Sequence, residues 1–140
     1  MNNRDYLSQG FTCVLSRGGE IVFSAKEHGI KPLMYIIDNN IDVKGCDAAD
    51  KIVGKAAALL YVHMGVGFVY AQVMSKSALE LLRQHGIKAE CETLTDRIIN
   101  RLGTDICPME KTVSEISDPF IAYTALKSKL EQMKKAAADK

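Results

Sequence analysis

Residues 50–78 read DKIVGKAAALLYVHMGVGFVYAQVMSKSA, and this stretch decides the fold. Its first half, from about Lys51 to Met64, has few polar positions, which predicts a central helix covered on most sides by other elements. The run from Val66 to Met74 is rich in β-branched and aromatic residues and predicts a strand. Ser75 or Ser77 can then cap a following helix.

That following helix should end at Gly86, since glycine commonly terminates helices. Residues 87–92 then alternate between apolar and polar side chains, as a half-buried strand does. A strand, a helix and a strand in this order form a crossover unit, which predicts parallel pairing of the two strands with a right-handed connection.

Two short strand-like runs, 11–16 and 20–24, precede this unit and are separated by Arg17-Gly18-Gly19, which predicts a hairpin. Pro32 suits the first turn of a helix that runs to Asn39-Asn40. The stretch from Gly45 to Asp50 is expected to be a connection.

Three helices are expected beyond the crossover unit. A short one covers Thr95–Leu102, and a second opens at Cys107-Pro108 with proline at its first position. The last follows Asp118-Pro119 and packs on the outside through an apolar stripe of Ala122, Leu126, Leu130 and Met133. Residues 1–140 are expected to form one domain, with 134–140 a frayed tail.

The amino-acid composition argues against some classes of function for this chain, namely nucleic-acid binding and membrane association. The formal net charge of +1 gives no general attraction to nucleic acid or anionic lipid, and no apolar run approaches the roughly 18 residues of a membrane span. Four scattered cysteines without a C-x-x-C pair, and no signal-like amino terminus, indicate a cytoplasmic protein with free thiols. We therefore expect a small-molecule partner, no nucleic-acid or membrane partner, and a possible homo-oligomer.

Four blocks of the chain resemble a small prokaryotic family of unknown function that shares the cytidine-deaminase-like fold. The resemblance spans roughly residues 10 to 115. Its blocks are residues 24–33, 50–57, 100–103 and 107–110. The resemblance implies a three-layer α/β/α domain with a mixed sheet of four to five strands and helices on both faces. It also implies a pocket where deaminases have their active site, but it carries no established activity.

Zinc deaminases place H-x-E or C-x-E at the start of one helix and P-C-x-x-C at the start of the next. This chain has Lys55 followed by alanines at the first point, and serines with Ala78 at the second. The three isolated histidines have no companion at metal-ligand spacing. The sequence therefore predicts no metal site and no cofactor.

Lys55 is the leading candidate for chemistry, because a charged side chain on an apolar helix needs a carboxylate, an anion or water in a cleft. The alternative is a lysine extending from the exposed edge of the helix, near Asp47 and Lys51. Gly54 either permits close backbone approach or only close helix packing. The pair is not a P-loop, since residues 49 and 56 are both alanine.

Ser75 and Ser77 fall where deaminases have their paired cysteines, and hydroxyls at a helix start bind anions well. Simple capping is their ordinary role. Arg101 offers a planar fork for carboxylate or phosphate, and Asn100 can contact a base edge. The alternative for this pair is a helix carboxyl end at which a cation complements the dipole.

Cys107 at a helix start can be a nucleophile with a lowered thiol pKa, although a buried, inert thiol is the commoner state. Glu110 either completes a helix cap or meets Lys55 or Arg101 across the pocket.

These residues favour a metal-free protein that binds a small nucleotide or nucleoside-like ligand in the pocket corresponding to the deaminase active site. Gly54, Lys55, Ser75, Ser77, Asn100, Arg101 and Glu110 are the expected ligand contacts. Two alternatives stay open. One is a non-zinc enzyme that uses Lys55 and Cys107, and the other is a partner-binding protein with a vestigial pocket.

Overall fold

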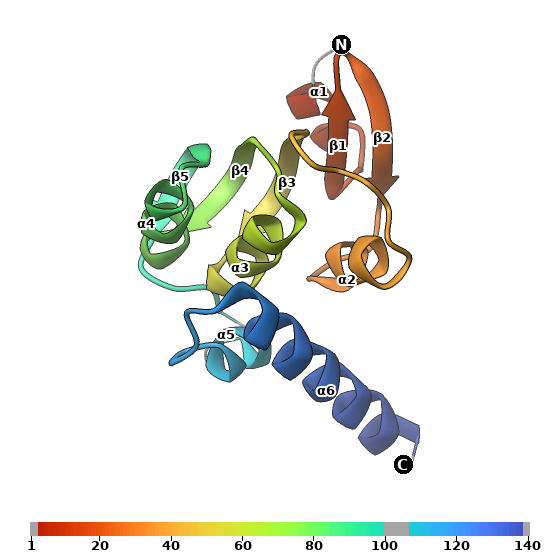
Figure 1. The fold of residues 1–140 in the computed structure, drawn as a ribbon, viewed down its shortest axis with the longest axis vertical. Helices are drawn as coiled ribbons and strands as arrows, with labels where there is room; N and C mark the ends of the chain where they lie inside the picture. Colours follow the sequence, from red (N-terminus) through yellow and green to blue (C-terminus); the bar gives the residue numbers. More distant parts are fainter. Residues whose placement is uncertain (1–2, 100–106, 139–140) are drawn as a thin grey trace.

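A computed structural model describes residues 3–99 and 107–138 of the chain. Five strands form one mixed sheet in the order β2-β1-β3-β4-β5. β1 pairs antiparallel with β2 and β3, whereas β3, β4 and β5 run parallel. Figure 1 shows helices α2, α3 and α4 beside the sheet, with α1 near the start of the chain and α6 extending to the other end.

The elements follow the chain in the order that the sequence predicts, with one helix and one strand added. The strands are β1 (Cys13–Arg17), β2 (Glu20–Ala25), β3 (Asp47–Val53), β4 (Phe68–Ser75) and β5 (Lys88–Thr95). The helices are α1 (Asn3–Leu7), α2 (Lys31–Asp38), α3 (Lys55–Met64), α4 (Lys76–Gln84), α5 (Pro108–Thr112) and α6 (Pro119–Ala138). The hairpin, the helix at Pro32 and the parallel crossover through α4 are confirmed.

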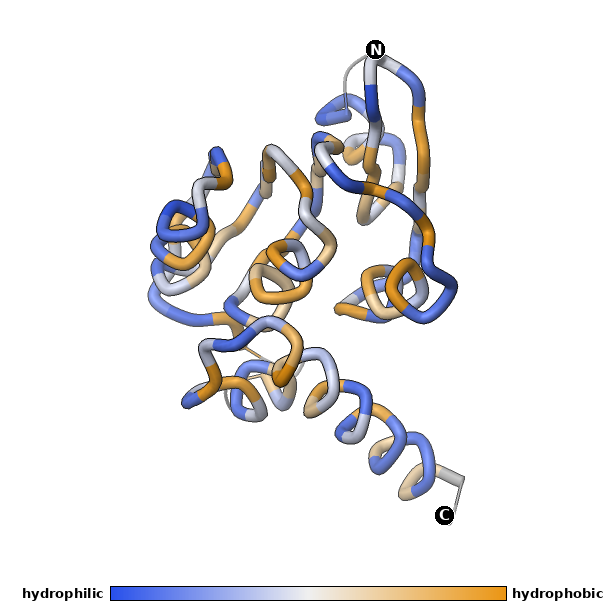
Figure 2. The backbone as a smooth tube through the Cα atoms, viewed as in Figure 1, coloured by the Kyte–Doolittle hydropathy of each residue, from blue (hydrophilic) through white to orange (hydrophobic). Residues whose placement is uncertain are grey.

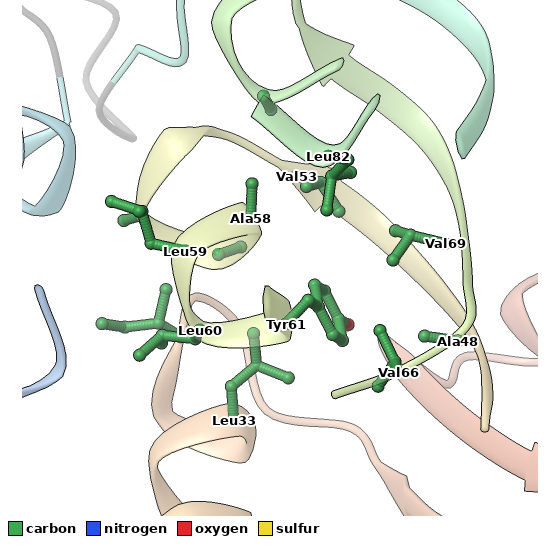
Figure 3. Packing of buried hydrophobic residues seen from close by; sticks show 14 of the residues in the cluster. Leu33, Ala48, Val53, Ala58, Leu59, Leu60, Tyr61, Val66, Val69 and Leu82 are labelled. Atoms are coloured by element: carbon green, nitrogen blue, oxygen red, sulfur yellow. The ribbon is translucent and has the colours of Figure 1, made fainter. Parts of the chain in front are cut away.

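Helix α3 lies at the centre of the core, as its apolar sequence predicts. Residues 56–61 are buried on every side of the helix, and Figure 2 shows this segment as predominantly hydrophobic. Figure 3 shows Leu33 of α2, Leu82 of α4 and Val69 of β4 around it. The opposite face of the sheet has a smaller cluster in which Leu7 of α1 packs on Ala49 and Tyr70. The three-layer α/β/α class is therefore confirmed.

Two expectations about local structure are wrong. Residues 47–53 form strand β3, whereas the sequence suggested a connection up to Asp50 and a helix from Lys51. The backbone of this segment pairs with β1 on one side and β4 on the other, and that pairing overrides its low strand propensity. The helix expected from Thr95 is also absent as far as residue 99, because β5 continues to Thr95 and residues 96–98 are irregular.

The two outer helices close the structure over α3. Cys107 is the N-cap residue of α5, and the Ile121 N–H donates to Asp118 Oδ1 at 2.9 Å at the start of α6, as predicted. Ala122 and Leu126 of α6 are fully buried, and the helix continues to Ala138, through part of the expected frayed tail. Within the described residues, none of the helices is long and apolar enough to cross a membrane.

Candidate functional site

A pocket of about 480 Å³ opens beside the carboxyl end of β3, where the chain turns into α3. We call it the Asp50 pocket. Its walls come from the β1 start, the loop before α2, the β3–α3 turn, the segment around Ile98, the start of α5 and the far half of α6. The pocket is lined by residues that include Thr12, His28, Ile30, Lys31, Asp50, Lys51, Ile52, Gly54, Ala57, Ile98, Ile99, Cys107, Glu110, Leu130 and Met133.

The first polar feature of the pocket joins Glu110 of α5 to the start of α3. The N–H groups of Lys55 and Ala56 donate to Glu110 Oε1 and Oε2, each at 2.7 Å. These donors have no partner within α3, and a carboxylate complements the positive end of the helix dipole. Burial raises the pKa of Glu110, and the two backbone hydrogen bonds oppose that shift.

Gly54 makes this contact possible. A Cβ atom at position 54 would lie 2.1 Å from Glu110 Oε1 and 2.7 Å from Ile98 Cγ1, far inside van der Waals contact. The backbone of Gly54 has φ −98°, which any residue adopts, so the requirement is one of space and not of backbone conformation. The close-approach interpretation of Gly54 is therefore the one that the geometry supports.

The second polar feature is a buried group of three side chains that meet at Asp50. Tyr61 of α3 donates its hydroxyl to Asp50 Oδ2 at 2.7 Å, and Cys13 Sγ lies 3.5 Å from the same hydroxyl. Burial raises the pKa of Asp50 to about 7, against the opposing hydrogen bonds from Tyr61 and the backbone. Asp50 therefore changes charge near neutral pH while it lines the pocket.

The basic side chains of the pocket lie toward solvent. His28 and Lys31 are exposed, and Lys51 is half-buried. The loop that carries His28 is tied to β1 through Thr12, whose hydroxyl lies 2.5 Å from the Glu27 carbonyl oxygen, to which it donates. The pocket thus has carboxyl groups in its interior and cations at its rim.

Three of the predicted site residues meet in this pocket, and three others that the structure describes do not. Gly54, Cys107 and Glu110 line it. Lys55 does not line the pocket; its Nζ donates to the Ser114 carbonyl oxygen at 3.1 Å, beyond the end of α5. The Lys55 ammonium therefore contacts the end of α5, and the main-chain N–H of Lys55 is the group that meets Glu110 at the pocket wall.

The two serines serve the fold. The Ser75 hydroxyl accepts from the Ala78 N–H at 3.2 Å as the N-cap of α4, and Ser77 Oγ lies 3.2 Å from it. Neither serine lines the pocket, and the capping alternative describes the contact that Ser75 makes. Asn100 and Arg101 lie outside the described residues.

The residues at both helix starts do not fit a catalytic zinc ion. Zinc needs three protein ligands from His, Cys, Asp or Glu in a catalytic site. Residues 55–57 and 75–78 supply none of these side chains. In the part of the chain that the structure describes, no three such side chains gather at metal-binding distance.

Asp50 is the functional candidate that sequence reasoning missed. The sequence predicts only a connection that ends at Asp50 and assigns its carboxyl group no role. The signal that could have found it is a carboxylate within a short segment that precedes a helix, since parallel sheets present binding groups where a strand leads into a helix.

Comparisons with known proteins place these observations in a family. The family model described as "TM1506: Domain of unknown function (DUF1893)" matches residues 4–130. The crystal structure of a DUF1893 family protein, TM1506 from Thermotoga maritima, superposes with a TM-score of 0.82 at 28% identity, covering 90% of this chain and 85% of that chain.

A second similar structure is the apo dCMP deaminase from the cyanophage S-TIM5. Its TM-score is 0.51 at 12% identity, over 64% of this chain and 95% of that chain. This likeness shows the fold alone, and it agrees with the cytidine-deaminase-like arrangement of sheet and helices. No curated protein matches the chain.

Proposed function

We propose a function for this chain, which belongs to the DUF1893 family of unknown function: it binds a small nucleotide or nucleoside-like ligand in the Asp50 pocket. The observation that carries the proposal is the pocket itself, whose volume of about 480 Å³ is of the size that holds small organic ligands. It opens at the carboxyl end of a parallel strand and the amino end of a helix, the usual position of ligands in α/β sheets.

The walls of the pocket suit a flat ring. Ile30, Ile52 and Ile98 supply apolar surface, and few polar groups converge on the space between them. The exposed Lys31 and the half-buried Lys51 can receive the phosphate of a nucleotide at the rim, where the His28 ring can add a hydrogen bond. A structure of similar fold is named a dCMP deaminase, which supports nucleotide binding by analogy only.

We place this binding in the cytoplasm. All four cysteines are free thiols in the structure, and free thiols persist in reducing compartments. The proposal needs no resident metal, since ligand binding here uses the carboxyl groups, the apolar walls and the rim cations.

The test compares the wild type with two tryptophan variants. Ile99 lines the pocket and is 56% exposed, so Ile99→Trp fills the mouth of the pocket without disturbing the core. Ile121→Trp is the matched control, because Ile121 is 54% exposed at the start of α6, away from the pocket lining.

Thermal melts with nucleoside monophosphates and nucleosides are the measurement. We expect at least one of them to raise the melting temperature of the wild type and of Ile121→Trp, but not of Ile99→Trp. The proposal fails if none of these compounds shifts the wild type at millimolar concentration. It also fails if the shift persists in Ile99→Trp.

A further inference from the structure

The interior of the Asp50 pocket offers hydrogen-bond acceptors and few donors. Asp50 is 8% exposed and Glu110 is half-buried, whereas the cationic side chains of the pocket are nearer to solvent. The two N–H groups at the start of α3 are already engaged by Glu110. A ligand that fills this space must therefore complement carboxyl oxygens.

Asp50 keeps some capacity to accept further hydrogen bonds. Its Oδ2 accepts from Tyr61, Oδ1 accepts a long hydrogen bond of 3.4 Å from the Ile52 N–H, and the Lys51 N–H also contacts the carboxyl group. A carboxylate has about four acceptor positions, so a ligand donor can still be received. None of the described residues forms an ion pair with Asp50. A buried carboxylate without a cation is costly, so a donor or a positive charge brought by a ligand relieves that cost.

The Tyr61 hydroxyl cannot supply such a donor to the ligand, because its proton is directed at Asp50. The Thr12 hydroxyl is likewise committed, since it donates to the Glu27 carbonyl. Both side chains hold the wall in place. Of the two carboxyl groups, Asp50 is the one whose oxygens are not both satisfied by short backbone hydrogen bonds.

We propose that Asp50 is the specificity-determining residue of the pocket and that it selects ligands with an amidine-like edge, in which a ring N–H stands beside an exocyclic amino group. Such an edge presents donors to Asp50 and leaves the rest of the ring against the apolar wall. The inference rests on the proposed function for the nucleotide part of the ligand, but the edge itself can be tested with fragments that are not nucleotides.

The experiment is calorimetric titration with two matched pairs of probes. GMP and IMP differ by the 2-amino group of the base, and 2-aminobenzimidazole differs from benzimidazole in the same way. The amino member of each pair should bind the wild type roughly tenfold more tightly or better, the scale of one hydrogen bond to a charged group.

Asp50→Asn keeps the size of the side chain and an acceptor for Tyr61, but it removes the charge. In this variant the amino and non-amino members should bind within about threefold of each other, which marks loss of a charged partner. Asp47→Asn is the matched control, because Asp47 lies on the same strand, is exposed and does not line the pocket. It should keep the discrimination of the wild type, and circular dichroism should show that both variants are folded.

The outcomes of the titrations separate the proposed nucleotide binding from the proposed role of Asp50. If both members of the nucleotide pair bind equally well, the inference about Asp50 is overturned while nucleotide binding stands. If only the fragments bind, with the amino compound preferred, nucleotide binding is overturned while Asp50 keeps its role. If none of the four compounds binds, or if Asp50→Asn still discriminates, the inference is wrong.

Discussion

Gly54 and Glu110 act as one unit at the scale of single residues. The missing side chain of Gly54 leaves the space in which Glu110 meets two N–H groups of α3. Sequence reasoning identified both residues from the family resemblance and left the choice between cap and pocket contact open. In the structure Glu110 caps α3 and not its own helix α5, and it does so from the wall of the pocket through the N–H groups of Lys55 and Ala56.

A double-mutant cycle tests this unit. Gly54→Ala should displace the Glu110 carboxylate and lower the free energy of unfolding by roughly 2 to 4 kcal/mol, through the loss of two charge-assisted hydrogen bonds. In a Glu110→Ala background the same change should cost under about 1 kcal/mol, because the obstructing oxygen is gone. Urea unfolding of the four proteins is the measurement, and strictly additive losses would contradict the coupling.

Asp50 should make stability depend on pH. Its pKa of about 7 in the folded protein exceeds the value of roughly 3.9 in an unfolded chain, so the folded state holds the proton more tightly. The stabilisation is complete below about pH 4 and is lost as pH rises through about 7. Tyr61 and Cys13 face the same carboxyl group, and burial raises the pKa of both. Neither loses its proton in this pH window.

Glu110, His28 and Lys51 share the pocket and can also contribute to the pH dependence of stability. Comparison with Asp50→Asn separates the contribution of Asp50 from theirs. The variant should gain stability relative to the wild type between pH 4 and 7, by roughly 4 kcal/mol in total at about 1.4 kcal/mol per pKa unit. Unfolding curves at a series of pH values measure the difference. A difference that does not change with pH would show that Asp50 titrates normally.

At the scale of helices and strands, the sequence predicted the elements whose apolar residues recur in a regular pattern. It failed for the strand whose structure depends on pairing with neighbouring strands. The apolar centre of α3 and the Asp118 cap of α6 were readable from the sequence, because burial and capping follow from local residue types. Strand β3 was not. Its first residues, Asp47 to Asp50, have little strand propensity, and only pairing with two neighbours makes them extended. Asp50 was missed for the same reason.

Helix α6 offers a test of which contacts hold an outer element. Leu126 is fully buried against the core and Ile121 is 54% exposed on the same helix. Leu126→Ala should lower the free energy of unfolding by about 2 to 5 kcal/mol, while Ile121→Ala should change it by less than about 1 kcal/mol. Chemical denaturation measures both. Similar losses in the two variants would mean that α6 does not pack as described.

The packing of the whole molecule determines how fast each cysteine thiol reacts with an alkylating reagent. Cys13, the first residue of β1, is 2% exposed against Tyr61 of α3, and burial raises the pKa of its thiol well above the ordinary value. Cys107 is half-buried and lines the pocket. In native buffer, iodoacetamide should therefore modify Cys107 faster, and Cys13 should react only when urea unfolds the chain.

Peptide mass spectrometry at successive times measures both rates in one sample. Cys46 is the internal control, since it is fully buried and should follow Cys13. Equal rates for Cys13 and Cys107 in native buffer would show that the core opens more readily than its packing indicates.

The Asp50 pocket draws its walls from Thr12 near one end of the chain to Met133 near the other. During synthesis on the ribosome, the site is therefore incomplete until α6 has left the exit tunnel and docked. Under the proposed function, a ligand would meet only finished molecules, and by mass action it would favour the fully assembled fold over every partial one.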